Sequence, residues 1–364
     1  MSARHELRAL TSVRGLAAWW VVLFHTRFAV DWLPAPVMRV AAHGYLAVDF
    51  FFLLSGFVIW LSSVDRLRDG GVRAIPAFLW RRVARIWPLH LFMLAGAVAL
   101  ALLLAATGRD AGGQFPFAEL PWHILLIQNW GLADDLTWNT PAWSISCELA
   151  AYLAFPWLAL SIDWRRVPTS ALLAVVAALL VLLHLIYVSR GAWQMGHEIT
   201  RIGVWRCLIE FTCGSVVAAL YLRWRERPLA PVLGAVVLAA VLLGGWVRGW
   251  AETLTVPAAF ASLLLALALT SGMRGNPLNG RAIHYLGEIS YATYLCHFLL
   301  WFCFKLAFVR DATAVPVWQM ACFALMTLCA SALLYHGVER PAQRWLNAWR
   351  WPRLRPRPIA PSAR

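Results

Sequence analysis

The chain has 364 residues, of which 61% are hydrophobic and only 14% are charged. Soluble domains contain about 45–50% apolar and about 25% charged residues, so the composition excludes an ordinary soluble enzyme, a disordered chain and a disulfide-rich secreted domain. The net charge of +14 would suggest nucleic acid as the partner of a soluble protein. Here it has to be weighed first against the charge bias of membrane proteins.

Ten apolar segments follow one another along the chain, each near the roughly 20 residues that a helix needs to cross about 30 Å of hydrocarbon. We therefore expect an all-α, polytopic membrane protein. Continuous apolar runs, rather than alternating ones, exclude a β-barrel. The expected spans are 10–30, 44–62, 87–107, 143–161, 169–188, 201–222, 229–247, 252–272, 289–309 and 315–337. The apolar segment Pro121–Trp130 is too short to cross and is expected to form a re-entrant or interfacial helix.

Arginines are distributed unevenly between alternate loops. With the N-terminus in the cytoplasm, 22 arginines lie on the cytoplasmic side and six in the outer loops. This bias follows the positive-inside rule and predicts that both termini are cytoplasmic. It also accounts for most of the net charge, so we expect no nucleic-acid partner. The Arg-, Trp- and Pro-rich tail 342–364 is expected to contact membrane lipid or to be disordered.

The first span carries two polar groups, Arg14 and His25. Eleven residues of helix place them within about 20° of the same face and about 16 Å apart along the axis. Ionisable groups in the bilayer core are costly and are functional candidates. Taken singly, His25 could be a packing histidine and Arg14 a snorkelling residue, but the shared face predicts that both point into one cavity.

Two carboxylates enter the membrane at the expected depth of His25. Asp49 lies near the outer end of the second span, and Glu148 lies one turn inside the fourth. Either carboxylate could orient an imidazole and stabilise its charged form. The alternative for Asp49 is an interfacial residue bonded to the backbone. No His/Cys ligand spacing indicates a metal site.

Arginines also cluster just before the third span, at Arg81, Arg82 and Arg85. Arg82 and Arg85 are three residues apart and would share one helix face. Paired guanidinium groups suit a phosphate or pyrophosphate. The alternative is ordinary positive-inside anchoring.

An ordered set of motifs spans residues 8–341. These are Arg14-x10-His25, the stretch Gly44–Phe57, Arg82-x-x-Arg85, Trp143-Ser-Ile-Ser-Cys-Glu148, Leu286-Gly-Glu-Ile-Ser-Tyr-x-x-Tyr-Leu-x-His297 and Glu339-x-Pro341. With this set the chain resembles the acyltransferase-3 family of membrane acyltransferases, and it is more weakly similar to exopolysaccharide acetyltransferases of the xanthan type. It departs from the family just before Arg14, where many members carry an acidic residue and a glycine.

The resemblance implies transfer of an acyl group, usually acetyl from acetyl-CoA, to a sugar hydroxyl of a surface glycan. It also implies a membrane acyltransferase domain over 1–341, located in the bacterial inner membrane. Many members add a C-terminal hydrolase-like domain. Because this chain stops at Arg364, it is expected to be a stand-alone transferase. In this interpretation Arg81, Arg82 and Arg85 hold the phosphates of coenzyme A, and the pantetheine arm passes Arg14 towards His25.

His25 would then act as general base on the acceptor hydroxyl, with Asp49 or Glu148 orienting it. A covalent acyl-histidine is an alternative. The acceptor would be a polysaccharide or its lipid-linked oligosaccharide, and the oligomeric state stays open. Two functions of other classes also remain: a glycan or lipid transporter, because buried charges mark translocation paths as well, and a structural subunit of a polysaccharide assembly complex.

Overall fold

The computed structural model describes residues 7–109, 113–273 and 275–349. Over these residues the chain is all-α, as expected, with fourteen α-helices and one isolated β-bridge between Val30 and Ala314. The ten helices of 18 or more residues are α1 (Arg8–Thr26), α3 (Ala47–Gly70), α4 (Ile75–Ala106), α6 (Ala142–Ser161), α7 (Thr169–Ser189), α8 (Ile199–Trp224), α9 (Leu229–Val247), α10 (Glu252–Thr270), α12 (Ser290–Phe308) and α13 (Val317–Leu334). The short helices are α2 (Ala35–Ala42), α5 (Leu120–Leu125), α11 (Arg281–Glu288) and α14 (Arg340–Ala348).

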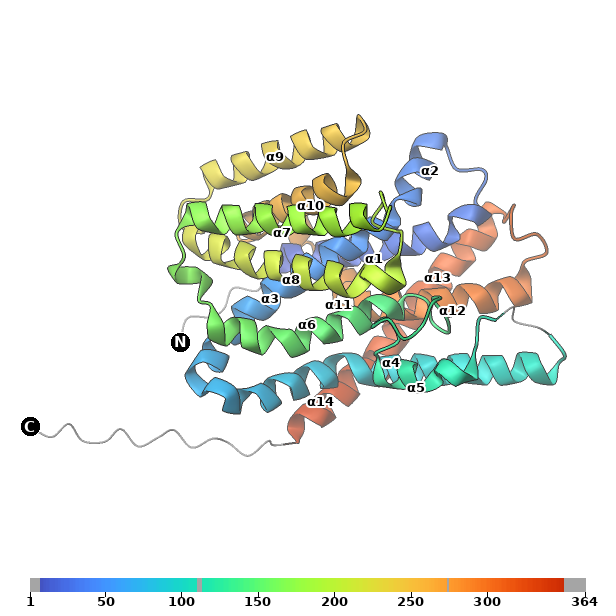
Figure 1. Cartoon of the computed structure of the whole chain (residues 1–364). Helices are drawn as coiled ribbons and strands as arrows, with labels where there is room; N and C mark the ends of the chain where they lie inside the picture. Colours follow the sequence, from blue (N-terminus) through green and yellow to red (C-terminus); the bar gives the residue numbers. More distant parts are fainter. Residues whose placement is uncertain (1–6, 110–112, 274, 350–364) are drawn as a thin grey trace, which may run out of the picture.

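Each expected span coincides with one of the ten long helices, and successive long helices run in alternate directions (Figure 1). In the described residues, eight helical stretches are long and apolar enough to cross a membrane, and α3 and α4 share one of them, Ala35–Ala106. Helix α1 is not among the eight, because Arg8, Arg14 and His25 make it less apolar. The chain is therefore a multi-pass membrane protein, and its orientation stays a prediction. Arg4, Arg274 and residues 350–364, which entered that prediction, lie outside the described residues.

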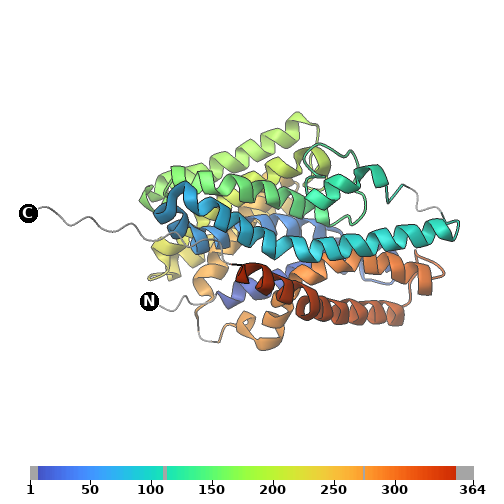
Figure 2. The same ribbon diagram turned by 90° about the horizontal axis from the view of Figure 1, so that it is seen from below.

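Helix α4 differs most from its expected bounds, because it begins at Ile75 rather than near residue 87. Pro88 lies inside this helix of 32 residues. Membrane helices tolerate such a proline when neighbouring groups satisfy the freed backbone. Helix α4 continues through Pro88 and crosses the whole molecule (Figures 1 and 2). The three arginines at 81, 82 and 85 therefore lie on a long helix and not in a loop.

Glycines bring the central helices α3 and α8 into close contact. A Cβ atom at Gly56 would collide with the backbone of Phe211, and one at Gly214 would collide with the backbone of Leu53. Small residues of this kind let membrane helices approach closely. As a result α8 lies mostly in the interior, whereas α9 presents side chains such as Leu233 and Val237 to the outside.

A second close contact holds α1 against the end of α11, just before α12 begins. A Cβ atom at Gly15 would lie 2.6 Å from the backbone nitrogen of Gly287 and 2.7 Å from the carbonyl carbon of Leu286. Helix α11 ends at Glu288 and α12 begins two residues later. The glycine contact therefore fixes the depth of α1 relative to α12.

The segment expected to be a re-entrant or interfacial helix, Pro121–Trp130, is only partly helical. Helix α5 stops at Leu125 because Leu126 adopts the left-handed conformation with φ 57°. The chain then returns to α6, and the Asn139 amide donates a hydrogen bond of 2.9 Å to the carbonyl oxygen of Leu295 on α12. The loop thus caps one end of the bundle beside α6 and α12.

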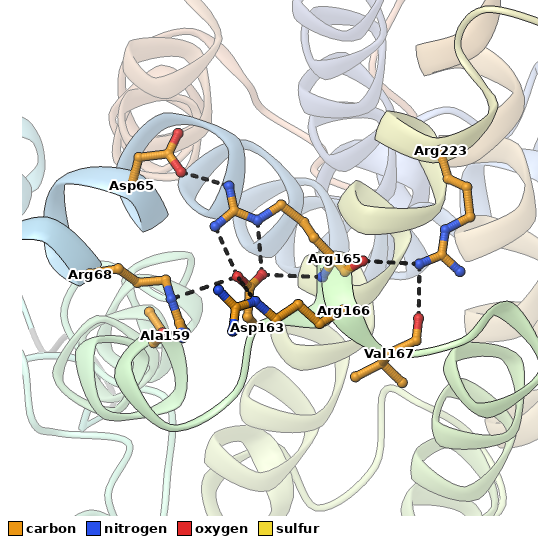
Figure 3. Close-up of polar contacts among 8 residues, drawn as sticks. All are labelled: Asp65, Arg68, Ala159, Asp163, Arg165, Arg166, Val167 and Arg223. Atoms are coloured by element: carbon orange, nitrogen blue, oxygen red, sulfur yellow. Dashed lines mark hydrogen bonds and ion pairs between the residues drawn. The ribbon is translucent and has the colours of Figure 1, made fainter.

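Arginines at one end of the bundle converge on Asp163 (Figure 3). Arg165 contacts the Asp163 carboxylate at 2.8 Å, and Arg68 and Arg166 contact it at 3.7 and 3.6 Å. The hydrogen bond from Arg165 holds the pKa of Asp163 below its usual value. Arg165 also pairs with Asp65 at 2.7 Å. The cluster ties the end of α3 to the turn between α6 and α7.

Candidate active site

A cavity of about 180 Å³ lies between α1, α3, α4, α6 and α12 in the described part of the chain. The charged side chains that line it are Arg14, Arg82, Arg85 and Glu148. Tyr152, Tyr291 and Tyr294 add hydroxyl groups, and Phe51 and Phe52 add apolar walls. Even when the ion-pair partner of Arg85, Glu339, is counted, the arginines outnumber the carboxylates and favour an anionic guest, while the apolar walls suit an uncharged chain.

The two arginines of the Arg82-x-x-Arg85 motif have different partners. Arg85 forms an ion pair with the buried carboxylate of Glu339. Arg82 makes no ion pair in the described part of the chain, and its Nε is buried without a hydrogen-bond partner. Arg81 does not line the cavity. The two arginines that were expected to bind phosphate together therefore differ: Glu339 neutralises Arg85, whereas Arg82 is left without an ion-pair partner in the described residues.

Arg14 reaches the cavity from α1, but it does not snorkel to an interface. Its Nε donates a hydrogen bond of 2.9 Å to the Ser290 hydroxyl, and its Nη2 donates one of 2.7 Å to the Gly287 carbonyl oxygen. Both acceptors lie where α11 meets α12. The guanidinium is thus held by neutral acceptors, and it makes no ion pair in the described residues.

Glu148 lines the same cavity, where it accepts a hydrogen bond from the Ser55 hydroxyl. Asp49 lies elsewhere: its carboxylate accepts a hydrogen bond of 2.6 Å from Nε of Arg206, and both side chains are almost fully buried. Glu210 lies 4.0 Å from the same nitrogen. The expectation that Asp49 or Glu148 orients His25 is not met, because other groups hold both carboxylates.

His25 instead contacts a second histidine. Its Nδ1 lies 2.9 Å from Nε2 of His297 on α12 and 3.1 Å from the carbonyl oxygen of Val21. His297 is fully buried, whereas His25 is half-buried. Helix α1 therefore presents Arg14 to the junction of α11 and α12 and His25 to α12, on one side of the helix as the eleven-residue spacing predicts.

The cavity ends before it reaches the two histidines, and His25 is not among its lining residues. Tyr294 lies at this end, with its ring centroid 6.2 Å from that of His297. Its hydroxyl is 2.8 Å from the Ser144 hydroxyl. The expected continuous cavity from Arg14 to His25 is therefore not seen: Arg14 lines the cavity, His25 does not, and Tyr294 is the lining residue next to His297.

A family model described as an acyltransferase domain matches residues 7–336. The chain belongs to the acyltransferase-3 family. The matched region contains all four charged residues of the cavity and both histidines, while Glu339 follows shortly after it. The resemblance inferred from the ordered motifs is confirmed.

Several curated proteins are similar to this chain over most of its length. The acyltransferase MdmB of Streptomyces mycarofaciens is 30% identical, over 98% of this chain and 94% of its own. The exopolysaccharide production protein ExoZ of Rhizobium meliloti is 27% identical, over 83% of this chain and 90% of its own. The putative peptidoglycan O-acetyltransferase YrhL of Bacillus subtilis is 24% identical over 91% of this chain, which spans only 54% of YrhL. No solved structure matches the chain.

Two features of this acyltransferase-3 site were not assigned a role from the sequence. Arg206 and Glu210 lie four residues apart inside an apolar span. A charged pair of this kind in a span is a sequence signal for an intramembrane countercharge to Asp49. His297 stands in the last motif, but nothing in the local sequence links it to a residue 272 positions earlier.

Proposed function

We propose that this acyltransferase-3 protein transfers acetyl from acetyl-CoA to a sugar hydroxyl of an exported polysaccharide or of its lipid-linked repeat unit. The observation that carries the proposal is the arginine-lined cavity whose Tyr294 end lies next to His297, the partner of the half-buried His25. The arginine-lined cavity suits a thioester of an anionic coenzyme. The histidine suits the role of proton acceptor for a hydroxyl. The names of the relatives YrhL and ExoZ support a glycan acceptor.

The donor would bind with its phosphates at the arginine end of the cavity. Arg82 is the main anion-binding candidate there, because Arg85 is neutralised by Glu339. Arg14 would face the middle of the coenzyme, and the acyl group would lie beside Tyr294 and Ser144. Acetyl-CoA is too large for a cavity of about 180 Å³, so its nucleotide part would remain at the rim. By the arginine bias this rim is cytoplasmic.

In the chemical step His25 would remove the proton of the acceptor hydroxyl. The hydroxyl oxygen attacks the thioester carbonyl carbon, an ester bond forms and the C–S bond breaks. The coenzyme leaves as a thiolate and takes up the proton that His25 received. A covalent acyl-histidine would divide the same exchange into two steps. Loss of a general base typically costs 10²–10⁴-fold in rate.

Two measurements test the proposal. Purified protein in lipid nanodiscs should release coenzyme A thiol from acetyl-CoA when a sugar acceptor is present. Surface polysaccharide from a host lacking the protein should lose acetyl groups, which would also identify the acceptor. A transporter or a structural subunit would consume no thioester and would tolerate His25→Ala, so wild-type acetylation by that variant contradicts the proposal.

A further inference from the structure

The hydrogen bonds around the two histidines determine which nitrogen of each ring carries hydrogen. Nδ1 of His297 lies 3.1 Å from the carbonyl oxygen of Thr293. A carbonyl oxygen only accepts hydrogen bonds, so this Nδ1 must donate. In a neutral imidazole the other nitrogen is then a bare acceptor. Nε2 of His297 therefore accepts, and Nδ1 of His25 donates to it across 2.9 Å.

The same bonds leave the second nitrogen of His25 available. Because Nδ1 of His25 carries the hydrogen, its Nε2 holds a lone pair. This Nε2 makes no hydrogen bond within the described parts of the chain. The rings of Phe24 and Phe298 flank His25, with centroids at 5.1 and 5.3 Å. The imidazole is thus held in one orientation with a single free basic nitrogen.

His297 must be neutral for this arrangement to hold. Its side chain is fully buried, and both of its ring nitrogens face neutral groups, Thr293 and His25. A buried imidazolium without a countercharge would be very costly. No carboxylate bonds either ring in residues 7–109, 113–273 and 275–349.

We propose that His297 is the positioning residue of this site: it fixes His25 as the tautomer whose Nε2 accepts the proton of the acceptor hydroxyl. The inference rests on the proposed function, and it gives an imidazole the part that a carboxylate plays beside many catalytic histidines. When Nε2 of His25 takes up the proton, the lone pair of His297 Nε2 still accepts from Nδ1 of His25 and stabilises the new charge. The proton then passes from His25 to the coenzyme thiolate, and His297 exchanges none.

Two substitutions at position 297 separate positioning from packing. His297→Phe keeps an aromatic ring, somewhat larger than imidazole, but removes the acceptor, and His297→Gln changes the shape but offers an amide oxygen close to the place of Nε2. Positioning predicts that His297→Phe lowers kcat by at least about tenfold, up to the 10²–10⁴-fold that a general base contributes, with KM for acetyl-CoA unchanged. It also predicts that His297→Gln retains more activity. The reverse order, with His297→Phe active and His297→Gln impaired, would mean that His297 only fills space.

A measurement on the wild-type protein keeps the inference testable even if both variants fold poorly or the acyl donor proves to be a different one. Nitrogen-15 NMR of labelled histidine distinguishes ring nitrogens that carry hydrogen from bare ones. The signals of His25 can be identified by comparison with His25→Ala. We expect Nδ1 of His25 to carry hydrogen and Nε2 to be bare. An Nε2–H tautomer in the wild type would overturn the inference, whereas absence of thioester consumption with the expected tautomer would overturn only the proposed function.

Discussion

Replacing Gly15 by alanine should separate α1 from the junction of α11 and α12. The new Cβ would lie 2.6 Å from the nitrogen of Gly287 and 2.7 Å from the carbonyl carbon of Leu286. Both neighbours are backbone atoms of a helix, so they cannot rotate away. An ordinary contact of about 3.4 Å requires the helices to move apart by about 0.8 Å, and overpacking of this kind typically costs about 1–3 kcal/mol.

The displacement should act on the site more than on the fold. Arg14 bonds Gly287 at 2.7 Å, and His25 bonds His297 at 2.9 Å. A shift of about 0.8 Å would take both to or beyond the limit of a hydrogen bond, near 3.5 Å. Misplacement by about 1 Å can cost on the order of 10²-fold in rate, so we expect Gly15→Ala to lose between about tenfold and a hundredfold in acyl transfer.

The assay compares acyl transfer and thermal unfolding of Gly15→Ala with those of a matched control in the same detergent. Gly234→Ala serves as the control, because Gly234 also lies in a helix but a Cβ atom there would meet no other atom within 4 Å. The control should match the wild type in both measurements. If Gly15→Ala also matches the wild type in both, the glycine contact does not set the position of α1 and the reasoning is refuted.

Three further predictions concern charged groups. Arg206→Met should lower the free energy of unfolding by about 3–5 kcal/mol, because Asp49 would stay buried without its countercharge; unchanged thermal unfolding would argue against this ion pair. Arg82→Ala should raise the apparent KM for acetyl-CoA about tenfold or more, since hydrogen bonds to charged groups contribute about 1.5–3 kcal/mol. Arg85→Ala should instead mainly lower thermal stability, because it leaves the buried carboxylate of Glu339 unpaired. Equal effects of the two variants on KM would contradict this division of roles. The ion pairs of Asp163, whose pKa is lowered in the folded state, should stabilise fully above about pH 5, and this contribution should fall as the pH drops through the lowered pKa; an acid titration of Asp163→Asn that shows the same loss as the wild type would contradict it.

Long apolar runs made the helices predictable, because the length needed to cross a bilayer is a local property of the sequence. The bounds were least accurate at α4, whose first turns carry arginines and therefore resemble a loop. The shared face of Arg14 and His25 was also predictable, since it depends on helical periodicity alone.

The partners of the polar groups were not predictable in the same way. Asp49 is separated from Arg206 by 157 residues, and His25 from His297 by 272. Such pairs depend on which helices are neighbours, and apolar patterning says little about this. Depth alone suggested that Asp49 and His25 would meet, but they contact different helices of the bundle, with Asp49 facing α8 and His25 facing α12.

The bonds of Arg14 have a consequence for the order in which the protein is made. Its two partners, Gly287 and Ser290, follow it by 273 and 276 residues. At the usual synthesis rate of about 5–20 residues per second, the ribosome needs about 14–55 s to reach them. For that time the first helix carries a guanidinium whose final acceptors do not yet exist. The site is therefore complete only after α12, the ninth of the ten long helices, has left the ribosome. A chain stopped before α12 would carry His25 without the His297 ring that orients it.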